Sequence, residues 1–408
     1  MIELAEKQLN THRSERESKR ALEHLLKYSA AAALGQEETM HLDTNEVLPR
    51  FIPVLLAHFS PSELAELLGK QAADQLLEMY RTEMLQNLFL ENELRRVLHA
   101  FHEAGIAIML FKGPALAYTV YPQPHMRTYH DLDMLIRGED LERTSKMLTE
   151  LGYTYYEEFR ANVTNSKRRG YNFVLERADA WLEVLIELHT APHESEIGMD
   201  FDVAALWTNA QPITVLGEPT LTMHLVDHLL YLCWHYRFHS FSRLLWLYDV
   251  VVILRSAGDD FDWKMLVEKA RQQKLASTMY YCLSWCRALF EVDVPEGVMQ
   301  ELKPPALCRL IIERLAVPDP LSALARQQEY NRRVLAHHVM VDHWGALLKV
   351  SLRTLFPAPA TIGQRYMERS RLPLKLYFLY YFIHPWITLA KGLHYVLRTR
   401  GRSARSKS

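Results

Sequence analysis

The sequence predicts an α+β protein in which a small mixed β-sheet, in the middle of the chain, is flanked by helical N- and C-terminal regions. Residues 1–103 and 221–397 carry helical patterns, whereas apolar runs of strand length are confined to residues 104–220. Strands gathered between two helical regions are typical of α+β folds. We therefore expect an N-terminal helical region (1–103), a sheet-containing core (104–220), a C-terminal helical domain (221–397) and a basic disordered tail (398–408).

Local signals define the helices of the N-terminal region. Ser60-Pro61-Ser62-Glu63 is a capping box with proline at the first helical position, which predicts the start of a helix. A long helix is expected from about Met79 to Glu103, and Gly105 suits its C-terminal end. Its buried stripe is expected to comprise Leu85, Leu88, Phe89, Asn92, Leu94, Val97, Leu98 and Phe101.

The core is expected to contain strands at Ile106–Phe111, Asp131–Ile136, Tyr171–Glu176 and Trp181–His189, with helices at Ala115–Tyr121 and Glu139–Leu151. The last two strands follow each other closely and are expected to form a hairpin. Trp181–His189 alternates along its length. Leu182, Val184, Ile186 and Leu188 share one face, and Glu183, Leu185, Glu187 and His189 share the other.

Composition restricts the class of protein. The 408 residues carry a formal net charge of -2, and this near-neutral balance argues against a general nucleic-acid binder. The four cysteines, Cys233, Cys282, Cys286 and Cys308, make no disulfide framework and are expected to be buried free thiols. The first twenty residues are polar and show no signal peptide, so the expected location is cytoplasmic.

The most informative stretch is Phe111–Ile136, which holds a strand end, a Lys-Gly-Pro turn, a short helix and then two aspartates in an apolar strand. Asp131 and Asp133 project from the same face of that strand, because side chains alternate. Adjacent carboxylates repel each other, and a cation removes the penalty. Mg²⁺ suits such oxygen ligands, so the pair predicts metal-assisted phosphoryl or nucleotidyl transfer.

Residues 104–153 resemble the uncharacterised nucleotidyltransferase family of the DNA polymerase β-like nucleotidyltransferase superfamily, and residues 186–192 do so more loosely. Residues 59–68 and 355–366 also resemble the family. The most specific part is the Lys112-Gly113-Pro114 turn followed, at this spacing, by Asp131-Leu132-Asp133. The resemblance implies a small mixed nucleotidyltransferase sheet in which three carboxylates on two neighbouring strands hold two Mg²⁺ ions around a nucleoside triphosphate.

Carried over by position, the resemblance implies that Asp131 and Asp133 are the carboxylate pair and that Glu187 is the third acid. Lys112 and Gly113 stand where the superfamily has a glycine turn that meets triphosphate oxygens. Two departures stand out. Proline follows Gly113 where glycine or serine is usual, and the third acid is Glu rather than the more familiar Asp.

Several assignments have alternatives. Lys112 and Arg127 are candidates for holding phosphate oxygens, and a surface or ion-pair role is the alternative for each. Glu183 competes with Glu187 as the third acid, because both lie on one strand face. The triplet Lys167-Arg168-Arg169 has two interpretations. It binds an anion, either the triphosphate or an anionic acceptor, or it is a solvated loop.

Four histidines share one face of a predicted helix: His224, His228, His235 and His239. We expect ordinary packing there in preference to zinc, with the helix lining the acceptor side as a further option. Asp249, in an apolar helix, is expected to be buried and hydrogen-bonded.

The C-terminal stretch Leu376–Ala390 is apolar and aromatic but too short to span a bilayer, which needs about 20 residues. It precedes Arg398–Ser408, which is basic. We favour a helix packed in the core with a solvated tail, and a weak contact with an anionic membrane surface is the alternative.

The resemblance implies a Mg²⁺-dependent nucleotidyltransferase that moves a nucleoside monophosphate from a nucleoside triphosphate, such as ATP, to an acceptor hydroxyl and releases pyrophosphate. The acceptor is left open, and a protein or small molecule fits the charge better than a nucleic acid. Family members occur alongside bacterial peptide and polysaccharide biosynthesis, which suggests a bacterial modification enzyme. The alternative is a non-catalytic nucleotide-binding or scaffold protein that keeps the fold.

Overall fold

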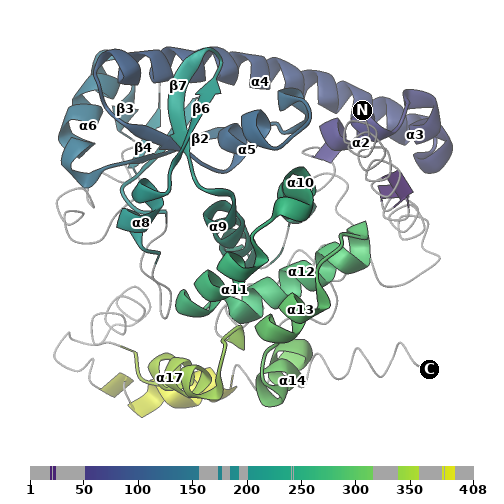
Figure 1. The fold of residues 1–408 in the computed structure, drawn as a ribbon, viewed down its shortest axis with the longest axis vertical. Coiled ribbons are helices and arrows are strands. Elements are labelled where there is room, and N and C mark those ends of the chain that lie inside the picture. The colour runs from purple at the N-terminus through teal and green to yellow at the C-terminus, as the bar shows by residue number, and fades with distance from the viewer. Residues whose placement is uncertain are drawn as a thin grey trace.

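The structure is a computed structural model that describes residues 19–20, 22–23, 51–155, 173–176, 184–192, 201–239, 241, 243–315, 339–357, 379–380 and 382–390. A long helix, α4, crosses one end of the molecule above a sheet, and most helices of the C-terminal half gather on the other side of that sheet (Figure 1). Three predicted features lie outside the described residues: the basic triplet at 167–169, Glu183 and the tail 398–408.

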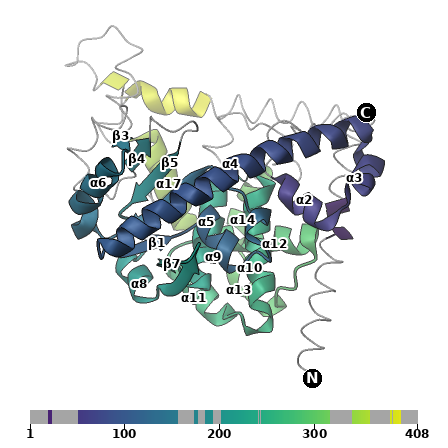
Figure 2. The ribbon, with the colours of Figure 1, turned by 90° about the horizontal axis from the view of Figure 1, so that it is seen from above.

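Three helices form the described part of the N-terminal region: α2 (Ile52–His58), α3 (Pro61–Leu68) and α4 (Lys70–Glu103). The capping box is confirmed, because the Ser60 hydroxyl accepts from the Glu63 amide while the Glu63 carboxylate accepts from the Ser60 amide at 2.7 Å. The helix α4 begins at Lys70, earlier than predicted, and runs past the sheet toward α3 (Figure 2).

Part of the predicted stripe of α4 is wrong. Leu85 and Leu88 are 64% and 57% exposed, because the apolar cluster beneath α4 begins only at Leu90. The buried apolar face over the sheet consists of Leu90, Leu94, Val97, Leu98 and Phe101. The sheet therefore supports only the C-terminal part of this helix.

The described strands form one mixed sheet in the order β3-β4-β5-β2-β1-β7-β6. Their bounds are β1 (Ile108–Leu110), β2 (Asp131–Ile136), β3 (Thr154–Tyr155), β4 (Phe173–Glu176), β5 (Leu185–His189), β6 (Gln211–Val215) and β7 (Glu218–Thr222). The β2–β5 and β1–β7 pairs are parallel, and the other pairs are antiparallel. The predicted α+β class with a small mixed sheet is confirmed, as is the antiparallel pairing of β4 with β5.

The hairpin β6–β7 was not predicted from the sequence. Pro212 and Pro219 stand in its two strands and weaken the strand pattern. Both are tolerated, because β6 is an edge strand and β7 pairs with β1 only at Leu221 and Thr222. A two-residue turn with positive φ at Leu216 and Gly217 joins the strands. The sheet thus extends to Thr222.

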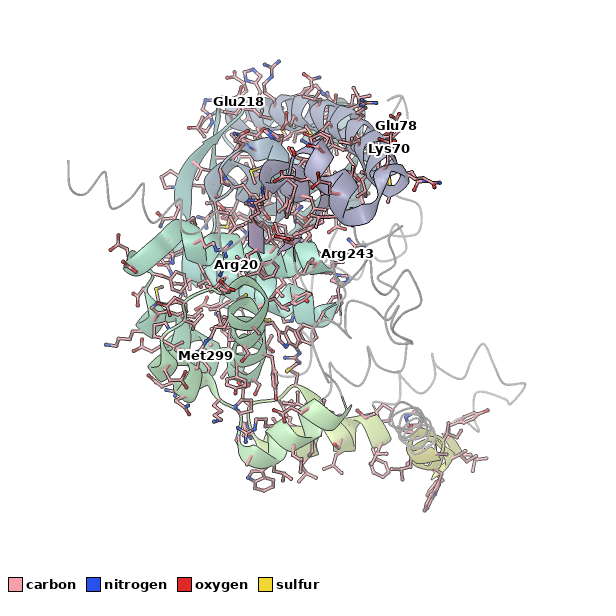
Figure 3. The ribbon with its side chains drawn as sticks, turned by 90° about the vertical axis from the view of Figure 1, so that its right-hand side faces the viewer. Arg20, Lys70, Glu78, Glu218, Arg243 and Met299 are labelled. Atoms are coloured by element: carbon pink, nitrogen blue, oxygen red, sulfur yellow. The ribbon has the colours of Figure 1, made fainter. Side chains whose placement is uncertain are left out.

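Helices complete both sides of the sheet. They are α5 (Gly113–Thr119), α6 (Leu141–Glu150), α8 (Val203–Thr208), α9 (Leu225–Phe238), α10 (Leu244–Ala257), α11 (Trp263–Gln272), α12 (Ala276–Phe290), α13 (Glu296–Leu302), α14 (Ala306–Leu315) and α17 (Trp344–Leu355). Figure 3 shows Glu218 and Glu78 at the end formed by the sheet and α4, and Met299 among the helices at the other end. The four cysteines are buried and free, as predicted.

Strand alternation gives the sheet two different faces. On β2, Leu132, Met134 and Ile136 join the apolar cluster that includes α4 and α6. The side chains between them project to the opposite face, where Leu135 belongs to the cluster of helices α9 to α13. Asp131 and Asp133 therefore face the C-terminal helices rather than α4.

The described part of the C-terminal aromatic segment is helical over residues 382–390. His384 is buried and lies 3.1 Å from the Thr354 carbonyl, so one side of the segment contacts α17. The expectation of a core helix is nevertheless wrong for Phe382 and Trp386, which are 71% and 73% exposed. None of the described helices combines the length and apolar character needed to cross a membrane.

Candidate active site

The candidate site forms where β2 and β5 run in parallel. The register places Asp133 opposite Glu187 and Asp131 opposite Leu185. Paired residues on neighbouring strands project to the same face, so the two carboxylates that the resemblance placed on different strands come together. The next residue on that face of β5 is His189.

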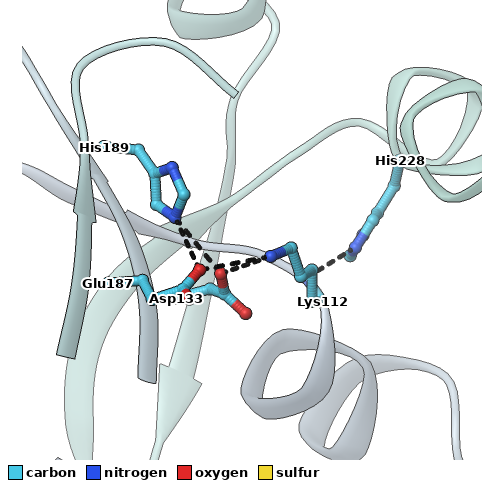
Figure 4. A network of polar contacts seen from close by, with 5 residues as sticks. All are labelled: Lys112, Asp133, Glu187, His189 and His228. Carbon is cyan, nitrogen blue, oxygen red and sulfur yellow. Dashed lines mark hydrogen bonds and ion pairs between the residues drawn. The ribbon is translucent and has the colours of Figure 1, made fainter. Parts of the chain in front are cut away.

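A lysine and a histidine bind these carboxylates (Figure 4). Lys112 Nζ lies 2.6 Å from Asp133 Oδ1 and 3.7 Å from Glu187 Oε2. His189 Nε2 lies 3.2 Å from the same Asp133 oxygen and 3.5 Å from the same Glu187 oxygen. One ligand atom from each of Asp133, Glu187 and His189 falls within 4.8 Å of the others. His189 was not predicted as a site residue, although its place two residues after Glu187 on one strand face is a usable signal.

The charges at this site are strongly coupled. Burial raises the pKa of a carboxyl, but Lys112 and the hydrogen bond with His189 hold the pKa of Asp133 well below its ordinary value. Burial likewise disfavours the Lys112 ammonium, yet the charges of Asp133, Tyr231, Glu187 and Asp131 together outweigh it and raise the pKa of Lys112. Asp133 is therefore ionised and Lys112 protonated at neutral pH.

Asp133 is also incompletely satisfied. The residue is 1% exposed, and its Oδ2 has no hydrogen-bond partner among the described residues. A buried carboxylate oxygen without a partner costs free energy unless something else binds it. Two carboxylates with one orphaned oxygen fit a divalent cation, because hard cations prefer such ligands.

Asp131 stands apart from this group. It is partly exposed and is not a member of the cluster formed by Asp133, Glu187 and His189. Burial and the charge of Asp133 raise the pKa of Asp131 to about 6. The role of Asp131 as a ligand stays a prediction.

The helix α9 reaches the site through His228. The Lys112 amide donates to His228 Nε2 at 3.2 Å, and burial lowers the pKa of His228 to about 3, so the ring is neutral and accepts. Lys112 has φ 57° and ψ -135°, a conformation that costs a residue with a side chain. This hydrogen bond therefore helps to hold the strained turn that aims the Lys112 side chain at the carboxylates.

The other predicted histidines have ordinary roles in the described structure. His224 caps α9 through an acceptor for the Val226 amide. The rings of His235 and His239 lie 4.5 Å apart, and each packs against Trp246 at 4.6 and 4.7 Å. The histidine face of α9 is thus a packed aromatic surface that begins at the site.

The model of a family described as "Uncharacterised nucleotidyltransferase" matches residues 8–291, which is more than half of the chain. The chain belongs to this family. The resemblance stated from the Lys-Gly-Pro turn and the aspartate pair is thereby confirmed. A search of curated proteins found no match.

Three solved structures show a distant similarity to this chain. A solution structure of the antibiotic-resistance factor ANT(2'')-Ia is 13% identical, with a TM-score of 0.34 and coverage of 48% of this chain and 98% of that one. Its crystal structure in complex with adenylyl-2''-tobramycin is 13% identical, with a TM-score of 0.31 and coverage of 45% of this chain and 97% of that one. An antigenic nucleotidyltransferase-like protein from Paracoccidioides brasiliensis is 10% identical, with a TM-score of 0.29 and coverage of 52% of this chain and 96% of that one.

The glycine turn of this family member is tightly packed. A Cβ atom at Gly113 would lie 2.6 Å from the Tyr129 Cβ, so any larger residue would force the turn away from the chain just before β2. The glycine is thus required for packing in the described structure. Its predicted contact with triphosphate oxygens stays a prediction.

Arg127 lies in a buried ion pair with Asp249. Its Nε and Nη2 donate to the two oxygens of Asp249 at 2.7 and 2.9 Å, and both residues are buried. The Tyr121 hydroxyl donates to the same carboxylate at 2.7 Å. The buried hydrogen-bonding role predicted for Asp249 is confirmed, and the ion-pair alternative describes Arg127 in this structure. Its phosphate contact stays a prediction.

Proposed function

We propose that this protein is a Mg²⁺-dependent nucleotidyltransferase that transfers a nucleoside monophosphate from a nucleoside triphosphate to an acceptor hydroxyl and releases pyrophosphate. One observation carries the proposal: Asp133 and Glu187 meet at paired strand positions, and a buried Asp133 oxygen has no partner among the described residues. Membership of the nucleotidyltransferase family supports this class of reaction.

Asp131, Asp133 and Glu187 are the proposed ligands of Mg²⁺, which when bound lowers the pKa of the attacking hydroxyl and neutralises the triphosphate. Lys112 places its ammonium 2.6 Å from Asp133 and 3.7 Å from Glu187, so it would lie within reach of the phosphate oxygens of a nucleotide bound through these carboxylates. Its flexible side chain has three donors, so it can turn from the carboxylates to a phosphate oxygen. Gly113 follows it in the same turn and is the proposed backbone contact.

The acceptor in this proposal is a protein or a small molecule. A formal net charge of -2 offers little attraction to the phosphate backbone of a nucleic acid. Four buried free thiols and the use of a nucleoside triphosphate suit a cytoplasmic location.

The test is incubation of the full chain with Mg²⁺, each α-labelled nucleoside triphosphate in turn, and a cell extract. We expect label to pass to an acceptor together with release of pyrophosphate. The Asp133→Asn variant is the control and should transfer no label. Nucleotide binding without transfer by the unmodified chain would instead favour a non-catalytic scaffold.

A further inference from the structure

We propose that His189 binds the metal through Nε2, beside Asp133 and Glu187, and that the site therefore prefers Mn²⁺ or a later transition-metal ion to Mg²⁺. The inference rests on the proposed function, because it concerns the same metal site. It goes beyond that proposal in its chemistry, since the three acids that the resemblance implies offer only oxygen.

The first observation is the spacing of the ligand atoms. Two ligands at about 2.0–2.1 Å from one ion lie about 3.0 Å apart at an octahedral angle and about 3.4 Å apart at a tetrahedral angle. His189 Nε2 is 3.2 Å from Asp133 Oδ1 and 3.5 Å from Glu187 Oε2. Both distances from the imidazole nitrogen are thus close to those between two ligands of one ion, and the Asp133 and Glu187 ligand atoms lie within 4.8 Å of each other.

The second observation is that the site is built to hold positive charge. The ammonium of Lys112 lies 2.6 Å from the same Asp133 oxygen, and the other Asp133 oxygen is buried without a partner among the described residues. A divalent ion that replaced this ammonium would have a free carboxylate oxygen available in addition to the three spaced atoms. The described cluster therefore already contains the ligand atoms that such an ion needs.

The third observation is that the imidazole is held in place before any ion binds. The His189 side chain is only 2% exposed, and its ring packs edge-on against Phe111 at a centroid distance of 5.0 Å. Its Nε2 points at the two carboxylates, while Nδ1 is buried on the other side of the ring and has no partner within the described ranges. A neutral imidazole that binds a metal through Nε2 carries its proton on Nδ1.

The nitrogen changes the selectivity of the site. Carboxylates suit both Mg²⁺ and Mn²⁺, whereas imidazole suits first-row transition ions better than Mg²⁺. A site with both kinds of ligand therefore favours Mn²⁺ or a later transition-metal ion over Mg²⁺. Removing the imidazole should therefore weaken Mn²⁺ far more than Mg²⁺. A loss of at least about tenfold in Mn²⁺ affinity is expected, because even the outer partners of a metal ligand contribute about 10–100-fold.

The experiment uses the full chain with Mn²⁺ alone and no nucleotide. Pulsed electron paramagnetic resonance detects a nitrogen nucleus bound to Mn²⁺, and histidines labelled with ¹⁵N change that signal in the unmodified protein. We expect a ¹⁴N coupling that shifts on ¹⁵N labelling and disappears in His189→Asn. The matched control is His235→Asn, which removes another buried imidazole on α9 that packs against Trp246, and it should keep the coupling. Titration calorimetry with Mn²⁺ and Mg²⁺ measures the change in preference.

The outcomes separate this inference from the proposed function. Bound Mn²⁺ without nitrogen coupling in the unmodified, ¹⁴N-containing protein would overturn the role of His189 and leave the carboxylate site intact. A coupling that survives His189→Asn would do the same. If neither Mn²⁺ nor Mg²⁺ binds, both proposals fail together. The isotope arm needs no substitution, so the absence of a nitrogen coupling overturns the role of His189 even where a variant does not fold.

Discussion

Two ion pairs, Arg127 with Asp249 and Lys112 with Asp133, differ in how completely they are satisfied. Arg127 binds both oxygens of Asp249, and Tyr121 donates to one of them. Lys112 and His189 share a single oxygen of Asp133, and the other oxygen has no described partner. The Arg127 cluster is closed, whereas the Asp133 cluster still has capacity to bind something.

The choice of cation explains part of this difference. The planar guanidinium of Arg127 matches a carboxylate at two points and loses both if it moves. The ammonium of Lys112 is a single charge on a flexible side chain, so it can leave the carboxylate at a smaller cost. An arginine in such a pair therefore stabilises the fold, whereas a lysine leaves the carboxylate able to exchange its partner for another cation.

The largest expected effect is the loss of activity when the Asp133 cluster is changed. Asp133→Asn should lower turnover at least about a thousandfold, because a catalytic metal contributes several kcal/mol of charge stabilisation. Initial rates of pyrophosphate release measure it. The exposed Asp259→Asn is the control and should keep full activity. Turnover within a factor of a few of the unmodified protein would remove Asp133 from the site.

The closed cluster should affect stability most. Asp249→Asn leaves Arg127 buried without its counter-charge and should lower the free energy of unfolding by about 3–5 kcal/mol. Urea unfolding measures the change. Glu296→Gln removes an exposed partner of Arg287 and should cost less than about 1 kcal/mol. An equal loss of unfolding free energy in the two variants would show that the Arg127–Asp249 pair does not stabilise the fold.

Lys112 distinguishes the two clusters directly. Lys112→Met removes the ammonium that shares oxygens with the proposed metal, so binding of Mn²⁺ without nucleotide should tighten about tenfold or more. That figure follows from roughly 1.5–3 kcal/mol for a hydrogen bond to a charged group. Calorimetry measures it, with the exposed Lys146→Met as the control. Weaker metal binding in Lys112→Met would mean that the lysine supports the ion rather than competing with it.

An exposed pair provides the smallest effect. The hydrogen bonds from Lys19 and from the Ser60 amide and hydroxyl lower the pKa of Glu63 to about 2, from an ordinary value of 4.5. The stabilisation is present above about pH 4.5 and is lost as the pH falls toward 2, because the unfolded state takes up the proton first. Glu63→Gln should flatten this acid-side fall in melting temperature slightly. An unchanged pH profile between pH 2 and 5 would show that the capping box contributes no acid dependence.

The sequence could predict the parts of the site that depend on local pattern. Asp131 and Asp133 were placed on one face of β2, and Glu187 on the polar face of β5, because strand alternation is a local rule. The contact of His189 with Asp133 depends on the parallel register of β2 with β5, and no local pattern encodes that register.

Contacts between distant elements account for the other differences. The role of His228 depends on how α9 packs over the Lys112 turn, which joins residues far apart in the chain. The exposure of Leu85 depends on where the sheet ends beneath α4. Such features follow from tertiary packing, which a single sequence read by pattern does not contain.

The sequence separations within the site have a consequence for folding order. Lys112 and Asp133 are 21 residues apart, Asp133 and His189 are 56 apart, and Lys112 and His228 are 116 apart. The entropy lost on closing a loop grows with its length, so contacts of short separation are expected to form first. The lysine would then neutralise Asp133 before the second strand brings Glu187 beside it, which spares the folding chain a cluster of unpaired negative charges. The strained backbone of Lys112 would be fixed last, when α9 docks and His228 arrives.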